Sequence, residues 1–335
     1  MPLNTKKFSI MIFGSTLGTG GFVMASKSFL PYLTLPLTSI LLFFFSVFSI
    51  ILLIKIILHP EIVKHELKDP LIGNFYARQP ISAVILAILC MNLLPESVVL
   101  SLLIYGAVLI FALTIYLSYH FFSSINIKFD QLHGGWFITP VANILITTAV
   151  LQYPASMITL TIGLLFFGIG AILFLLILDV LFFRLISHTL PRAELAPTNY
   201  IILAPIGILI VDIIQIANRA GVLFGTNLSA LSILAGMAFW GFGIWAIGIN
   251  VLFFIKYIKS GLRFHLGWWG YVFPTATFTL GTIALSSSVS LFKTLSLLLY
   301  LYLVLVFAIV LLFSLRQLLG QNKHGKGRFR IINGV

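Results

Sequence analysis

Charged side chains are scarce in this sequence. Asp, Glu, Lys and Arg together account for 8% of the 335 residues, and 60% of the residues are hydrophobic. A soluble domain of this length carries about a quarter charged residues. The composition therefore excludes a soluble domain and predicts an integral membrane protein.

Residue patterns that carry chemistry are missing as well. The single cysteine, Cys90, excludes an intrachain disulfide and a thiolate metal cluster. The seven histidines show no HExxH or comparable ligand spacing, and we interpret them as interfacial residues. GxSxG, P-loop and CxxC motifs are absent from the sequence. The sequence thus predicts neither an enzyme nor a protein with a metal or another cofactor.

Long apolar runs, by contrast, fill the chain. About 20 apolar residues cross the hydrocarbon core of a bilayer as a helix. Ten such runs are present, at 9–29, 36–58, 75–94, 97–120, 136–153, 157–184, 198–217, 228–256, 267–287 and 291–315. They predict an all-α polytopic protein whose single ten-helix transmembrane domain covers residues 1–320. A basic cytoplasmic tail is expected over residues 321–335.

The formal net charge of +12 would also suit a nucleic-acid-binding protein, but the positions of the cations favour another explanation. Alternating the loops between ten helices places 17 of the 20 Lys and Arg on one side. The other side receives only Lys27, Arg219 and Lys293. Such asymmetry predicts a plasma-membrane protein with both termini in the cytoplasm. The basic excess then reflects topology and contact with anionic lipid, not with nucleic acid.

Prolines recur in alternate runs. Pro80, Pro140, Pro205 and Pro274 lie inside the third, fifth, seventh and ninth runs, and the even-numbered runs have no interior proline. An interior proline kinks a helix and frees a backbone carbonyl that lipid cannot solvate. We therefore predict five helical hairpins, each with a kinked inner helix and a regular outer helix. The five inner helices are expected to surround a central pore.

The first run has glycines where the other inner runs have proline. Gly14, Gly18 and Gly21 in "FGSTLGTGG" (13–21) follow the small-residue spacing that lets membrane helices approach closely. We assign Gly14 and Gly18, together with three of the interior prolines, to the kinked or pore-lining positions. The fourth proline, Pro274, follows the bulky Phe273 directly, which raises the question whether that ring packs or plugs a pore.

Two ionisable residues lie on the predicted inner helices. Asp212 is seven residues after Pro205, and an intramembrane acid indicates function by default because it is costly to insert. It either exchanges protons along the cavity or is a neutral acid hydrogen-bonded to a neighbouring helix. Arg78, two residues before Pro80, either attracts anions into a vestibule or anchors the helix end to lipid headgroups. Both pairs of interpretations stay open.

Four stretches on the predicted inner helices carry a family resemblance. They are "FGSTLGTGG" (13–21), "HELKDPLIGNFYARQPISA" (65–83), "WFITPVANIL" (136–145) and "WWGYVFPTATFTLGT" (268–282). In this order they resemble the tellurite-resistance/dicarboxylate transporter family. That family includes plant slow anion channels, tellurite-resistance protein A, malate permease and the sulfite efflux pump.

The resemblance implies a homotrimer in which each protomer has its own pore, occluded by a phenylalanine at the position of Phe273 beside Pro274. It implies transport of small anions in a channel-like manner. The alternative is a proton-coupled carrier for a C4-dicarboxylate such as malate, or for sulfite, with Asp212 as the coupling residue. The chain departs from the family at Asp69-Pro70, where a His-Pro pair is usual. The anion, the direction of flux and the choice between channel and carrier stay open.

Overall fold

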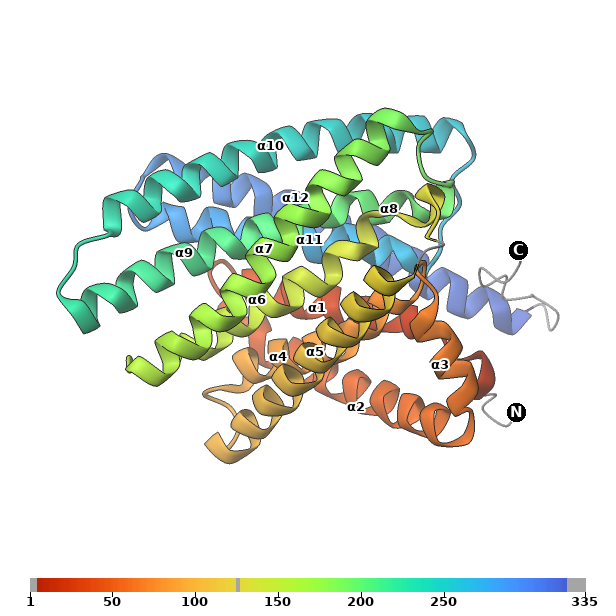
Figure 1. Cartoon of the computed structure of the whole chain (residues 1–335), viewed down its shortest axis with the longest axis horizontal. Helices are drawn as coiled ribbons and strands as arrows, with labels where there is room; N and C mark the ends of the chain where they lie inside the picture. The colour runs from red at the N-terminus through yellow and green to blue at the C-terminus, as the bar shows by residue number, and fades with distance from the viewer. Residues whose placement is uncertain (1–4, 125–126, 324–335) are drawn as a thin grey trace.

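The computed structural model describes residues 5–124 and 127–323, and Figure 1 shows their arrangement. All regular structure in these two ranges is helical, with no β-strand. The predicted all-α class is therefore confirmed. Part of the expected tail, residues 324–335, lies outside the described residues, while α12 continues through Lys323.

Five long helices have little of their surface covered by protein. They are α2 (Thr34–Leu58), α5 (Glu96–Ser123), α7 (Met157–Ser187), α10 (Ser229–Lys259) and α12 (Leu291–Lys323). Only 17% to 28% of the most apolar window in each is buried. A helix that is hydrophobic all round and yet exposed requires an apolar solvent. These helices thus form an outer layer that faces lipid.

Five further helices are mostly shorter and largely buried. They are α1 (Phe13–Ser26), α4 (Arg78–Cys90), α6 (Ile138–Val150), α9 (Leu203–Phe224) and α11 (Trp269–Ser286). Every residue of α4 and of α6 is buried. Each of the five continues from a 3-10 turn: η2 (Ile10–Ile12), η4 (Gly73–Ala77), η6 (Gly134–Phe137), η8 (Tyr200–Ile202) and η9 (Leu266–Trp268). Small residues and threonines let these helices approach one another closely.

The packing follows a regular order. The inner helices contact one another in the closed sequence α1, α4, α6, α9, α11 and back to α1. Each inner helix also packs against the outer helix that follows it in the chain. The short helix α3 (Pro60–Lys68) and the final turns of α12 lie at the same end of the bundle (Figure 1). A second short helix, α8 (Ala196–Asn199), leads into η8.

Length and composition support fewer spans than the ten expected. Six helical segments among the described residues are long and apolar enough to cross a membrane, and a bent pair made of α3 with η4–α4 adds a seventh if it counts as one span. The segments Ile10–Ser26 and Gly134–Val150, at 17 residues each, fall short of the length required. The ten-helix arrangement therefore stays a prediction.

The prolines lie nearer the helix ends than the sequence suggested. Pro80, Pro140 and Pro205 are each the third residue of an α-helix, where 3-10 geometry gives way to α geometry. The backbone N–H has no intrahelical partner in the first turn, so proline is tolerated there. Pro274 alone of the four lies inside its α-helix. Of the four prolines predicted inside helices, Pro274 lies inside its α-helix, and the other three lie at the start of theirs.

Candidate functional site

A small cavity lies among the inner segments. Its lining residues come from α1, α4, α6, η8 and α11 and are Gly14, Leu17, Arg78, Ile138, Val141, Ile201, Trp269, Gly270, Phe273 and Pro274. Its volume of about 10 Å³ has room for roughly one water molecule. All five inner segments therefore converge on one narrow constriction.

Phe273 forms part of this constriction and is 4% exposed. A Cβ atom placed on Gly21 would lie 3.0 Å from the Phe273 ring, so the missing side chain of Gly21 makes room for the ring. Pro274 cannot donate a backbone hydrogen bond to the carbonyl four residues earlier, which belongs to Gly270 on the cavity wall. The ring thus lies where α11 has lost one of its internal hydrogen bonds.

Arg78 brings a positive charge to the same cavity. Its side chain is 2% exposed, which contradicts the interpretation as a lipid-headgroup anchor. The guanidinium carbon lies 4.3 Å from the centre of the Phe75 ring, and Nη1 lies 3.8 Å from the sulfur of Met11. Nε is buried without a hydrogen-bond partner in the described part of the chain. A buried charge is costly unless it is paired, and no carboxylate lies within 4 Å of this guanidinium among the described residues.

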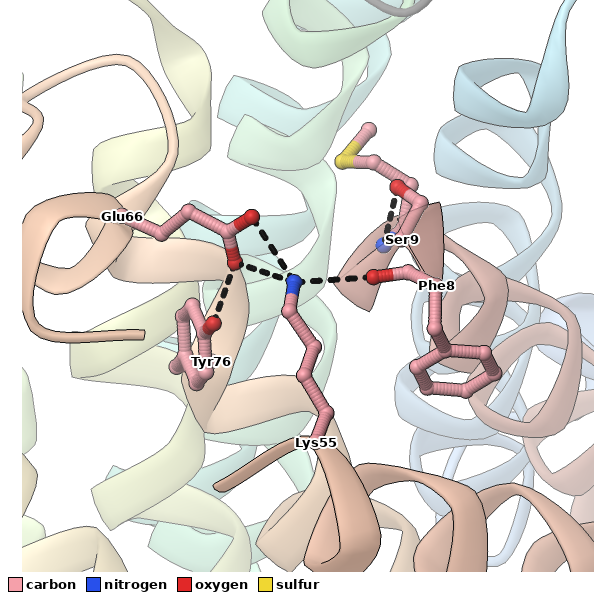
Figure 2. Close-up of polar contacts among 6 residues, drawn as sticks. Phe8, Ser9, Lys55, Glu66 and Tyr76 are labelled. Carbon is pink, nitrogen blue, oxygen red and sulfur yellow. Dashed lines mark hydrogen bonds and ion pairs between the residues drawn. The ribbon is translucent and has the colours of Figure 1, made fainter. Parts of the chain in front are cut away.

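Glu66, an acid of the helix that precedes η4, is paired with Lys55, as Figure 2 shows. Lys55 donates from Nζ to both Glu66 carboxylate oxygens, at 2.7 and 2.8 Å, and to the Phe8 carbonyl oxygen at 2.9 Å. The Tyr76 hydroxyl donates to the same carboxylate. This cluster ties α2 and α3 to η4, the turn that leads into Arg78. Among residues 5–124 and 127–323, the Lys55–Glu66 pair is the one ion pair within 4 Å.

Lys55 lies within the second apolar run predicted from the sequence, 36–58. It is in the last turn of α2, and its side chain is 1% exposed. Its long aliphatic stem is covered by the bundle, and its ammonium group is neutralised by Glu66. The hydropathy pattern places such a residue near a membrane surface but does not show what covers it.

Asp212 lies outside the cavity. It is fully buried in α9, and Thr148 of α6 donates a hydrogen bond of 2.6 Å to its Oδ1 atom. Oδ2 is buried without a partner in the described ranges. This environment agrees with the interpretation of Asp212 as a hydrogen-bonded acid between two inner helices. The structure does not bring Asp212 together with Phe273 and Arg78.

The other positions predicted from the sequence either line the cavity or lie where helices pack together. Gly14 lines the cavity, and a Cβ atom there would lie 3.1 Å from Nη1 of Arg78. A Cβ atom on Gly18 would lie 2.7 Å from a ring carbon of Trp269, so Gly18 allows α1 and α11 to pack closely. The prolines at the starts of α4, α6 and α9 are outside the lining set.

A repeated His-x-Gly-Trp motif escaped the sequence analysis. His133 precedes η6 and His265 precedes η9, and Nδ1 of each accepts a hydrogen bond from the backbone N–H of the glycine two residues later. His133 is 1% exposed, so its side chain is covered by other parts of the protein. The equal spacing of "HGGW" and "HLGW" before two inner helices was the available signal. Both histidines cap the start of an inner segment.

Acidification is expected to destabilise the fold through His133. Burial lowers the pKa of His133 to about 4, the carbonyls of Leu71 and Pro70 oppose this shift, and the charges of Arg184 and Arg78 add to it. The folded pKa lies below the ordinary value of 6.5. The unfolded chain therefore takes up the proton first. The stabilisation is complete above that ordinary value and is lost as the pH falls towards the folded pKa, by about 2 kcal/mol near pH 5.

The measurement is the melting temperature in detergent near neutral pH and near pH 5. His133→Asn retains an oxygen that can accept the Gly135 N–H, and it should show a smaller drop than the parent protein. An equal drop in both proteins would assign the acid sensitivity to other groups.

No group of three or more His, Cys, Asp or Glu side chains is gathered for a metal ion within the described ranges. The cavity instead combines one buried cation, one phenyl ring and apolar walls.

Comparison with known proteins gives a family match and two similar transporters. Residues 7–315 match the family described as voltage-dependent anion channel, SLAC1. One relative, named an uncharacterized transporter, of Methanocaldococcus jannaschii, is 28% identical over 294 residues, which cover 83% of this chain and 84% of that protein. A second uncharacterized transporter of the same organism is 27% identical over 292 residues, covering 82% of each chain.

Proposed function

Because the chain belongs to the SLAC1 family of voltage-dependent anion channels, we propose that it conducts small anions through its ring of inner helices. The family and the names of the relatives indicate a membrane transporter or channel for anions rather than an enzyme. The resemblance to the tellurite-resistance/dicarboxylate transporter family is thereby confirmed. The route, the gate and the anion site are the proposal.

The observation that carries the proposal is the pairing of Arg78 and Phe273 in one cavity. The unpaired guanidinium stabilises an anion in the passage, since converging positive charge raises the local anion concentration. The Phe273 ring blocks the passage, because an apolar constriction excludes water and hydrated ions. Conduction then requires the ring to leave its place beside Gly21.

The helix contacts support the larger arrangement that we propose around this site. Five hairpins, each an inner helix followed by an outer one, would enclose the passage, and the closed order of contacts among inner helices agrees with it. The short inner segments would cross as part of the bundle, because their neighbours shield them from lipid. By the family resemblance we propose a homotrimer with one passage in each protomer, both termini in the cytoplasm, and a location in the plasma membrane.

The direct test is electrical. Purified protein in a planar bilayer, under a potassium chloride gradient, should give currents that reverse near the chloride equilibrium potential. Reversal near the potassium potential would overturn the proposal. Repeating the measurement with malate or sulfite in place of chloride then gives the relative permeability of each anion.

The second candidate function is a proton-coupled carrier for a C4-dicarboxylate or sulfite. The buried Oδ2 atom of Asp212, which has no hydrogen-bond partner among residues 5–124 and 127–323, favours it because that oxygen can take up a proton. In proteoliposomes, a carrier coupled through Asp212 should accelerate when protons are driven inward, and Asp212→Asn should abolish this acceleration.

The matched control is Thr148→Val. It removes the hydrogen bond to Oδ1 but keeps the acid, so proton-driven acceleration should persist. Accumulation against a gradient that survives Asp212→Asn would rule out this coupling. A rate that follows only voltage and the anion gradient in all three proteins supports the channel.

A further inference from the structure

A second cavity lies away from the inner ring, between the outer helices α7 and α10. Its volume is about 310 Å³, and most of its lining is apolar, including Leu178 and Leu185 of α7 and Ile249 and Phe253 of α10. The two helices approach each other towards the upper right of Figure 1, and the rings of Phe182 and Trp245 lie 5.7 Å apart.

The cavity opens to the layer that faces lipid. Two of its lining residues, Ile186 and Trp245, are 87% and 50% exposed. Exposed apolar side chains on outer helices contact hydrocarbon rather than water in a membrane. An apolar chain from the bilayer can therefore enter the cavity from the side without crossing a polar layer.

The polar end of the cavity contains hydrogen-bond donors. Arg184 is 3% exposed, and its Nε and Nη1 atoms donate to the carbonyl oxygens of Phe129 and Thr189. Within the part of the chain that the structure describes, no carboxylate lies within 4 Å of this guanidinium. Among the described residues, Nδ2 of Asn199 is buried without a hydrogen-bond partner. Nε2 of His133 faces the carbonyls of Leu71 and Pro70 but forms no hydrogen bond of good geometry with them. Because Nδ1 of His133 accepts a hydrogen bond, Nε2 is the nitrogen that carries the proton.

Two exposed cations follow lining residues in the chain. Arg192 comes directly after Pro191, and Lys256 lies one turn beyond Phe253 on α10. An apolar chamber that is open to lipid, with unpaired donors and cations at one end, matches a molecule that has an acyl chain and an anionic head. A zwitterionic headgroup fits less well, because its own cation would face these side chains.

We propose that this cavity binds an anionic phospholipid, with an acyl chain between α7 and α10 and the phosphate beside Arg184, Asn199 and His133. The phosphate oxygens accept hydrogen bonds from Nδ2 of Asn199 and Nε2 of His133, and the phosphate charge neutralises the buried guanidinium of Arg184. The acyl chain fills the apolar space that the two outer helices leave between them. The site is separate from the cavity at Phe273 and does not depend on the proposed conduction.

The test is native mass spectrometry of delipidated protein titrated with palmitoyl-oleoyl phosphatidylglycerol or with the matching phosphatidylcholine. The intact protein should bind phosphatidylglycerol roughly tenfold more tightly. Ile249→Trp places a large side chain in the cavity and should remove this preference. Leu252→Trp makes the same change on α10 at a position that is 62% exposed and outside the lining, and it should retain the preference.

Arg184→Gln should also lose the preference for phosphatidylglycerol. Since Arg184 bonds two backbone carbonyls, Ile249→Trp serves as the decisive variant if Arg184→Gln fails to fold. Equal affinity for the two lipids, or unchanged phosphatidylglycerol binding in Ile249→Trp, would overturn the proposal. A changed subunit number in Ile249→Trp would also overturn it, because the cavity would then be a contact between copies of the chain.

Discussion

Phe273→Ala is expected to increase the anion current by roughly tenfold to a hundredfold. The buried ring lies in the constriction among five helical segments, and displacing it costs the free energy of its burial, about 1.5–3 kcal/mol. Each 1.4 kcal/mol changes an equilibrium constant tenfold. Removing the ring removes this barrier, so the open population of the passage rises by the corresponding factor.

The matched control is Phe278→Ala on the same helix. Phe278 is 1% exposed, but its ring contacts Gly243 of α10 and stacks near Trp240, outside the cavity. Both substitutions leave a void of similar size in α11, so both destabilise the fold to a comparable degree. Planar-bilayer currents should rise only in Phe273→Ala. Silence in a folded Phe273→Ala, or equal rises in both variants, would refute the role of Phe273 as a gate.

Arg78→Gln is expected to reduce anion selectivity roughly tenfold or more. A charge pair at 4 Å is worth about 4 kcal/mol at a partly screened site, and dehydration of the ion cancels part of that gain. Since no carboxylate within 4 Å neutralises Arg78 in the described residues, its full charge is available to a permeating anion. Glutamine retains hydrogen-bonding capacity but removes the charge.

The measurement uses the Phe273→Ala background, because its larger currents define the reversal potential more precisely than those of the parent protein. Addition of Arg78→Gln should move that potential away from the chloride value, and Arg78→Lys should restore it in part because the charge returns. A reversal potential that is the same in all three proteins would mean that another group selects the ion. A melting curve for each variant separates this effect from misfolding.

The sequence predicted the helical class and several members of the cavity. The sequence assigns Gly14, Arg78 and Phe273 to inner helices, and all three line the cavity. The signal was strong because lipid permits polar residues, glycine and proline inside a span only where other helices cover them. The alternation of such residues along the chain therefore indicates which helices are covered by other helices.

Other features depend on contacts that no local pattern encodes. The partner of Asp212 is Thr148, which is 64 residues distant in the chain, so a sequence reading leaves its environment open. The residues at which the inner α-helices begin were not predicted correctly. Residues in a 3-10 turn and in an α-helix have similar hydropathy, so the pattern does not mark where one gives way to the other. The burial of His133 comes from its place beside Phe75, another long-range contact.

Two inner segments are much shorter than the outer helices, which has an electrical consequence. Ile10–Ser26 and Gly134–Val150 rise about 25 Å along their axes, while α7 and α10, with 31 residues each, rise about 47 Å. Where solution reaches the ends of these two short segments, the transmembrane voltage falls over a shorter distance and produces a steeper field beside them. The Phe273 ring carries no net charge, so this field exerts its force on the ion in the passage and not on the plug.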